Sequence, residues 1–498
     1  MANRYRTLLL LPILSGCVHR IGFIPYEFSP LREGFDLVSG EGFSTPSSLQ
    51  SLVHVGEDVS PVYSDLLSGE TRFRLPSVGE QKILVIPVDF DDSPGNPSGP
   101  LALSQAFFGQ TGEGHYPSVA AYYDISSYHR FHLSGTVAPS YFRSPYSVSE
   151  LDAVRTTKKK TAILQNLYET AIAWYDATYP ERPSAEFASL DSKGRSFVPV
   201  YFVYDAPFTQ KEDGSLDLTR MLSAMSLSDP APIFWSPLSL CLGDGGELNP
   251  RSLVHGVGHL LGLPDLHDPK SPGGLSSPLG DTDPMGSGFG DHNPWSKFLL
   301  GWIRPRIITG NATLSLRPFA DSGDAVLLGR NWNGSLYDEY LLLVYGTPGG
   351  LAYVDANVDG GALNGYGLLA YVVDSRLGVY SSATGERLSY LTPSTDLTGK
   401  TVDFFASNTG GIQNGDSITG QFLVQLLDAS SGSQNLTPHF VAQGKASEGG
   451  RDVYFHVGMG MNDDAFEDFT FHSGESLGYT FKVESVSLTQ ARFRIRPR

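Results

Sequence analysis

Hydrophobic and polar positions follow two different patterns along this chain, and the pattern changes near residue 305. Before that point, residues 82–90 (KILVIPVDF) and 197–204 (FVPVYFVY) are apolar at nearly every position. Short apolar runs of this kind predict buried strands.

Two helices are predicted in the same part of the chain. Residues 117–128 (PSVAAYYDISSY) carry proline at a position that the first turn of a helix accepts. Within residues 150–179, apolar side chains recur at the spacing of one helix face. They are Ile163, Leu164, Leu167, Tyr168, Ala171, Ile172 and Tyr175. Because helices and strands alternate here without a repeating order, the pattern favours the α+β fold class.

Short β-type runs follow one another after residue 305. They are Thr313–Leu316, Ala325–Leu328, Glu339–Tyr345, Gly367–Val373, Tyr479–Val486 and Ala491–Ile495. Asn333-Gly334 lies between two of these runs and is a hairpin-turn signal. Regular short strands with turns between them predict a β-sandwich-like C-terminal region.

The first 17 residues have the pattern of an export signal. Two arginines in residues 1–6 precede the apolar run 7–14, which is far shorter than the ~20 residues of a membrane-spanning helix. The sequence Leu14-Ser15-Gly16-Cys17 then resembles the lipobox of bacterial lipoproteins. This resemblance implies a lipid on Cys17 that anchors the exported protein at the bacterial cell surface. An ordinary signal peptide with an incidental cysteine, and hence secretion, is the alternative.

Composition and charge narrow the class of protein. With 40% hydrophobic and 18% charged residues, the chain is typical of globular and not of disordered proteins. The formal net charge of −18 repels nucleic acid, so we expect no such partner. The sequence has two cysteines, which exclude a disulfide scaffold. Cys241 lies in an apolar run and is predicted to be a small buried residue.

The most informative segment is 249–268 (NPRSLVHGVGHLLGLPDLHD). Asn249 is a favourable helix cap, Pro250 suits the next position, and Gly262 is a residue that ends helices. The apolar stripe between them consists of Val254, Val257 and Leu261. A helix over these residues is therefore predicted.

Two histidines lie on one face of this predicted helix. His255 and His259 are four residues apart, a spacing at which two imidazoles can hold one zinc ion. After the chain turns back at the end of the helix, Asp265 can supply a third ligand and leave one position open for water. His267 and Asp268 are further candidates, which we interpret as loop residues or as partners of the ligands.

The same segment, HGVGHLLGLPDLHD, resembles the active-site segment H-E-x-G-H-x-L-G-L-x-D-x-Y-D of the immune inhibitor A-like metallopeptidases. Further resemblances extend over roughly residues 80–378. They lie at residues 82–90, 120–135, 283–288 (DPMGSG, similar to the family's methionine turn), 290–302, 338–345 and 365–377.

This resemblance implies a metzincin-like metallopeptidase domain over residues 80–305, after a linker or pro-segment at 18–79 and before the β-rich region 306–498. It implies zinc bound by His255, His259 and Asp265, with Met285 beneath the metal. The reaction of the family is hydrolysis of peptide bonds, so a polypeptide substrate or protein ligand is expected.

One departure from the family pattern concerns the chemistry directly. The family has glutamate after the first histidine, and this chain has Gly256. The carboxylate takes a proton from the zinc-bound water and passes it to the leaving amine, and loss of such a group costs roughly 10²–10⁴ in rate. Glycine also costs a helix about 1 kcal/mol relative to alanine. We therefore expect a zinc-loaded pseudopeptidase with little or no turnover.

Two alternatives stay open at this point. A carboxylate elsewhere, such as Asp244 or Glu247, would make the protein an active secreted metalloendopeptidase. A cleft that binds protein or glycan without metal-dependent cleavage is the other alternative. If only the base is missing, Gly256→Glu would restore activity.

Two further residue groups carry weaker expectations. His292 is predicted to make a structural hydrogen bond. Residues 461–468 (MNDDAFED) are acidic and are interpreted as a solvated loop, although their oxygen atoms are also of the kind that calcium prefers.

Overall fold

The computed structural model describes strand 37–38 and most of residues 73–498. Within 73–498 the description leaves out residues 110–116, 192–193, 212–216, 218, 243–247, 268–275, 280–281, 287–289, 333–335, 352–364, 393–394, 397, 410–421, 428, 430–440, 443–452 and 462–469. The predicted signal peptide with Cys17, nearly all of the predicted linker or pro-segment, the predicted turn at Asn333-Gly334 and most of the acidic segment 461–468 therefore lie outside the described residues.

The first half of the molecule is built on a mostly parallel sheet with the strand order β3-β2-β7-β9-β8. Strands β3, β2, β7 and β9 run parallel, and β8 joins the edge antiparallel. A short strand, β4, also pairs with β2. The bounds are β2 (Gly79–Asp89), β3 (Phe131–Val137), β4 (Phe142–Arg143), β7 (Val200–Tyr204), β8 (Met225–Leu227) and β9 (Ile233–Pro237).

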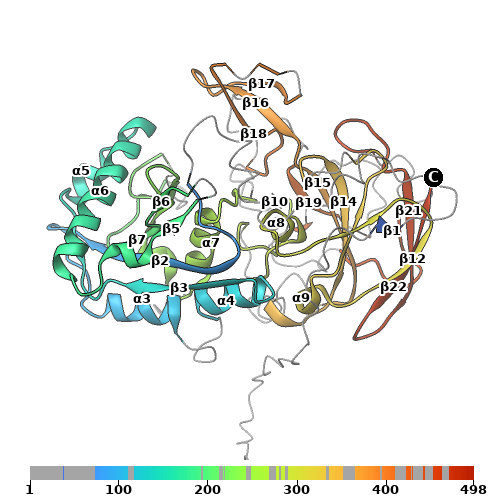
Figure 1. Cartoon of the computed structure of the whole chain (residues 1–498), viewed down its shortest axis with the longest axis horizontal. Coiled ribbons are helices and arrows are strands. Elements are labelled where there is room, and N and C mark those ends of the chain that lie inside the picture. The colour runs from blue at the N-terminus through green and yellow to red at the C-terminus, as the bar shows by residue number, and fades with distance from the viewer. Residues whose placement is uncertain are drawn as a thin grey trace, which may run out of the picture.

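Helices cover both faces of this sheet, as Figure 1 shows. Side chains alternate across a strand, so Ile83 and Val85 of β2 face one apolar cluster while Leu84 and Ile86 face another. The first cluster includes side chains of α3 (Gly99–Phe108), α4 (Val119–Ser126) and α7 (Arg251–Leu260). The second includes side chains of α5 (Val148–Asp152) and α6 (Thr157–Thr178).

The predicted elements of this half are present with shifted ends. The long helix begins at Thr157, because the Thr156 hydroxyl accepts a hydrogen bond from the Lys159 backbone at 3.4 Å and caps it. The predicted strand 197–204 divides into β6 (Ser196–Phe197) and β7, with β6 pairing instead with β5 (Ser189–Leu190). Two short 3₁₀ helices, η1 (Ser184–Phe187) and η2 (Leu238–Cys241), complete the connections.

The second half is rich in strands. A six-stranded sheet has the order β1-β11-β13-β14-β15-β19, and a three-stranded sheet has the order β12-β22-β21. The bounds are β1 (Leu37–Val38), β11 (Arg306–Ile308), β12 (Ala312–Leu316), β13 (Ala325–Leu328), β14 (Glu339–Gly346), β15 (Gly367–Asp374), β19 (Val424–Leu426), β21 (Tyr479–Val486) and β22 (Ala491–Pro497). Side chains of both sheets meet in one apolar cluster, so the two sheets pack face to face.

Smaller elements flank these sheets. The sheet of β16 (Leu377–Ser381), β17 (Arg387–Tyr390) and β18 (Lys400–Phe404) projects from the molecule at the top of Figure 1. Helix α8 (Pro294–Leu299), helix α9 (Phe319–Ser322) and the pair β10 (Ser276–Ser277) with β20 (Val441–Ala442) complete the described elements.

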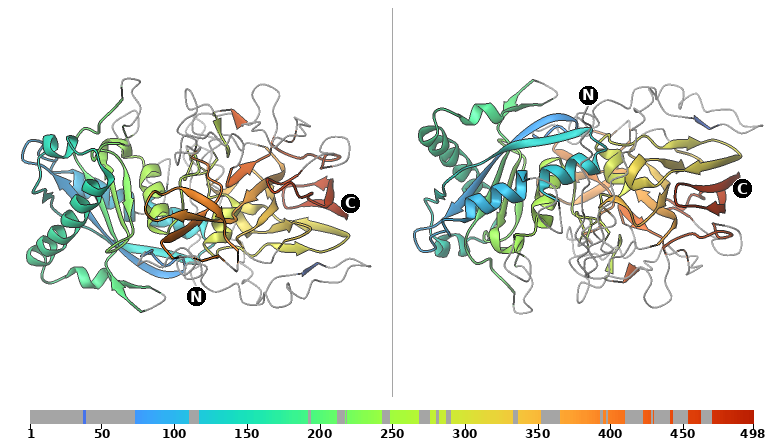
Figure 2. Two further views of the ribbon diagram at one scale, coloured as in Figure 1. Left: turned by 90° about the horizontal axis from the view of Figure 1, so that it is seen from above. Right: turned by 90° about the horizontal axis from the view of Figure 1, so that it is seen from below.

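One apolar core joins the two halves, which lie side by side in both views of Figure 2. Tyr340, Leu342 and Val344 of β14 belong to the same cluster as Val254 and Val257 of α7. The architecture is mixed, with several sheets and few helices, and is compatible with the predicted α+β class. Among the described residues, none of the helices combines the length and the apolar character that a membrane span requires.

A buried ionic cluster lies where β14 begins and β15 ends in the six-stranded sheet. Arg376 lies 2.8 Å from Asp374 and 3.1 Å from Glu339, and His472 Nδ1 lies 2.9 Å from Asp374. Burial and the neighbouring Asp374 carboxylate raise the pKa of Glu339. Burial alone would also raise the pKa of Asp374, but Arg376 and His472 outweigh it and lower that pKa. The single guanidinium thus contacts two buried carboxylates.

We expect Arg376→Met to destabilise the protein by roughly 3–5 kcal/mol, because it leaves Asp374 and Glu339 buried without their cation. Thermal unfolding measures the effect. Arg387→Met is the control, since the Arg387 guanidinium lies over the Phe405 ring at 4.2 Å and donates to a carbonyl rather than to a carboxylate. Equal losses of stability in the two variants would contradict this account.

Candidate metal centre

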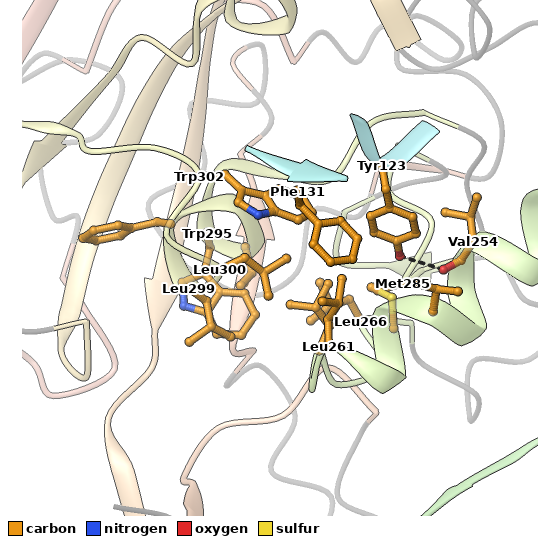
Figure 3. Packing of buried hydrophobic residues seen from close by; sticks show 14 of the residues in the cluster. Tyr123, Phe131, Val254, Leu261, Leu266, Met285, Trp295, Leu299, Leu300 and Trp302 are labelled. Carbon is orange, nitrogen blue, oxygen red and sulfur yellow. Dashed lines mark hydrogen bonds between the residues drawn. The ribbon is translucent and has the colours of Figure 1, made fainter. Parts of the chain in front are cut away.

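Helix α7 presents the two histidines. The N-cap of this helix is Pro250 and not the predicted Asn249, whose side chain lies one residue earlier and accepts a hydrogen bond from the Arg251 backbone at 3.1 Å. The helix ends at Leu260, and Gly262 follows with φ +92°, a conformation that favours glycine. The Tyr123 hydroxyl donates to the Val254 carbonyl at 2.8 Å and ties α4 to α7, as Figure 3 shows.

His255 and His259 point their Nε2 atoms at each other. These two atoms lie 3.0 Å apart. The Nδ1 atom of His255 lies 2.8 Å from the Pro284 carbonyl, and that of His259 lies 3.0 Å from the Leu263 carbonyl. A carbonyl only accepts, so each Nδ1 carries a proton, and Nε2 is the atom of each ring that is available to a metal.

Asp265 completes the cluster. Its Oδ1 atom lies 3.3 Å from the Nε2 atom of His255 and 3.3 Å from that of His259. Two ligands bound to a tetrahedral zinc at about 2.0–2.1 Å lie roughly 3.3 Å apart. The spacing of all three ligand atoms therefore fits one zinc ion.

The two histidines also determine the charge state of Asp265. Partial burial alone would raise the pKa of Asp265, but His259 and His255 outweigh it and hold that pKa well below its ordinary value. The imidazoles thus supply N–H groups or positive charge to Asp265, which is held as a carboxylate. Three atoms at this separation are held together by a shared cation, which is a proton when no metal is bound.

Glycines flank the histidine face on both sides. A Cβ built at Gly258 would lie 2.3 Å from the Met285 sulfur, so the absence of a side chain lets Met285 pack against the helix. Asp283 holds the turn before this methionine, because its Oδ1 accepts from the Met285 backbone at 2.7 Å. Its Oδ2 accepts from the Asn293 backbone at 2.6 Å and joins the turn to the start of α8.

The other flank, at Gly256, is closed by two aromatic rings. A Cβ built there would lie 2.3 Å from the Tyr201 hydroxyl oxygen and 2.6 Å from a ring carbon of Phe234. Both rings are buried, and Phe234 also stacks on His259 with ring centroids 5.4 Å apart. The position where the family has glutamate therefore has no room for a side chain.

The other residues named from the sequence have different outcomes. Asp244, Glu247 and Asp268 lie outside the described residues. Cys241 is fully buried, as predicted. The described residues contain a second group with metal-ligand chemistry, Glu339 with Asp374 and His472, but Arg376 already forms ion pairs with both of its carboxylates.

The prediction for His292 is wrong. Its ring is fully buried, and neither ring nitrogen has a hydrogen-bond partner among the described residues. The nearest carboxylate oxygen, Asp283 Oδ1, is 3.9 Å from Nδ1, which is too long for a hydrogen bond. The ring instead packs among Tyr122, Tyr123 and Trp302.

Tyr201 and Phe234 are the residues of this site that the sequence did not indicate. Both lie in apolar strands, where an aromatic side chain is ordinary core material. Only the sheet order, which places β7 beside β9, brings both rings to Gly256.

Comparison of the chain with models of known protein families finds no match, and comparison with curated proteins finds none that is significant.

We expect Gly256→Ala to lower the stability of the protein, although alanine is the better helix former by about 1 kcal/mol. The added methyl group must displace two buried rings, and overpacking of this kind costs about 1–3 kcal/mol. Gly349→Ala is the control, because the nearest atom to its Cβ would be 3.5 Å away. A higher unfolding temperature for Gly256→Ala would refute the packing described here.

Proposed function

We propose that this chain is a divergent member of the immune inhibitor A-like metallopeptidases, with a metzincin-like domain that holds one zinc ion and no longer hydrolyses peptide bonds. The observation that carries the proposal is the convergence of His255, His259 and Asp265 at ligand spacing. Beside them, aromatic rings occupy the space that a side chain at Gly256 would need. The site thus combines a complete donor set with a missing proton carrier.

The first part of the proposal, that the site holds zinc, rests on the chemistry of the three ligand side chains. Imidazole and carboxylate are ligands that zinc prefers, and each imidazole is oriented by a backbone carbonyl on its far side. Zinc in such a site, when it keeps a bound water, lowers the pKa of that water to about 7. The protein residues hold the metal, and Met285 packs against the helix that carries two of the ligands.

The second part of the proposal, that the site does not catalyse hydrolysis, rests on the surroundings of Gly256. Tyr201 and Phe234 occupy the space into which a residue at this position would point. Burial raises the pKa of Tyr201 well above its ordinary value, so this phenol does not take up the role of a base. Among the described residues, Asp265 is the carboxylate of the cluster, and it is a ligand in this proposal.

The cellular setting is part of the same proposal. Export through residues 1–17 with a lipid on Cys17 would place the protein at the bacterial cell surface. There the site and its surroundings would bind a polypeptide rather than cleave it. The formal net charge of −18 makes nucleic acid an unfavourable partner.

We expect metal analysis of the purified protein to find about one zinc per chain, and His255→Ala with His259→Ala to abolish it. Casein or a peptide library should show no chelator-sensitive cleavage. His132→Ala, on strand β3, is the matched control and should keep the zinc. Absence of zinc from the unaltered protein would end the proposal, and chelator-sensitive cleavage would favour the active metalloendopeptidase.

Gly256→Glu separates a missing base from a reshaped site. Because Tyr201 and Phe234 fill the space, we expect this variant to stay inactive and to unfold at a lower temperature than the unaltered protein. Gly256→Glu combined with Tyr201→Ala provides room for the carboxylate and should recover stability relative to Gly256→Glu alone. Cleavage by the single variant, without loss of stability, would show that only the base is missing.

A further inference from the structure

His267 lies beside the three proposed ligands without a defined role. Its Nδ1 atom is 3.8 Å from Asp265 Oδ1, and its side chain is 32% exposed. The Nδ1 atom itself is buried and has no hydrogen-bond partner among the described residues. A buried polar atom without a partner costs free energy, so the position of this nitrogen favours a bound group that the ring can contact.

The distance from Asp265 suggests what that group is. Ligand atoms of one zinc ion lie roughly 3.3 Å apart, and 3.8 Å is only slightly longer. His255, His259 and Asp265 already lie within 4.8 Å of one another, whereas His267 is outside this group. His267 would therefore have to approach the other three ligand atoms in order to bind the same ion, and its side chain is 32% exposed.

We propose that His267 is the fourth ligand of the zinc ion and closes the site. This inference rests on the proposed zinc site and specifies its coordination. Structural zinc sites have four protein ligands, whereas catalytic sites keep one position for water. With His267 bound, the site has three imidazoles and one carboxylate and no position at which a water is activated.

The closed site also explains the packing at Gly256. A proton carrier has a use only where the metal holds a water. If His267 takes that position, aromatic rings can occupy the space of the family's glutamate without any further loss of catalytic activity. Tyr201, Phe234 and His267 would then together distinguish a structural zinc site from a catalytic one.

The test is cobalt substitution of the full-length protein and of His267→Phe, followed by titration with azide. We expect the visible spectrum of the unaltered cobalt protein to stay unchanged on addition of azide. His267→Phe should give a spectrum that azide shifts, because one position is then open. Zinc affinity, measured by competition with a chelator, should fall by at least about tenfold, the loss that even an outer partner of a ligand produces.

His132→Phe is the matched control, with a side-chain exposure of 43% and no contact with the proposed ligands, and should behave like the unaltered protein. An azide-sensitive spectrum of the unaltered protein would overturn the assignment of His267 while leaving the zinc site intact. Chelator-sensitive cleavage that His267→Phe abolishes, with an unchanged spectrum, would also overturn it and make His267 a base. If neither zinc nor cobalt binds the unaltered protein, the proposed function fails first.

Discussion

The arrangement described here depends on the convergence of two imidazole Nε2 atoms and one carboxylate oxygen, which the fold brings together. Backbone carbonyls hold a proton on the far side of the His255 and His259 rings, so each Nε2 atom faces Asp265 and can share a cation with it, either a proton or a metal ion. Such a cluster is costly in isolation and becomes favourable when a cation is shared. The helix, its glycine stop and the turn that follows all serve to bring these atoms to one point.

The surroundings of the cluster determine what a cation would do there. A glycine on each flank of the histidine face lets another part of the chain approach the helix. At Gly258 the approach is made by the methionine after Asp283, which supports the helix. At Gly256 it is made by two rings of the sheet, which exclude a side chain. The two glycines thus look alike in the sequence, but one allows a residue to support the helix and the other marks a position where no catalytic side chain fits.

Sequence patterns located α7, its apolar stripe and the three residues of the cluster, because each of these follows from local periodicity or from spacing within 20 residues. They also located β2 and β7 of the first half and β12, β13, β14, β15, β21 and β22 of the second half, but not the other described strands. They did not locate the rings at Gly256, since Tyr201 and Phe234 come from strands 33 residues apart that only the sheet brings together. For His292 the pattern suggested a polar role, but burial among aromatic rings decided its environment.

The continuous apolar core has a consequence for the whole molecule. The helix that carries the two histidines shares its buried side chains with the central strands of the C-terminal sheet. Binding of an ion to the folded chain alone adds stability in proportion to the logarithm of ion concentration over the dissociation constant. That gain would therefore be distributed over both halves, so an ion bound at α7 would also stabilise the C-terminal sheet.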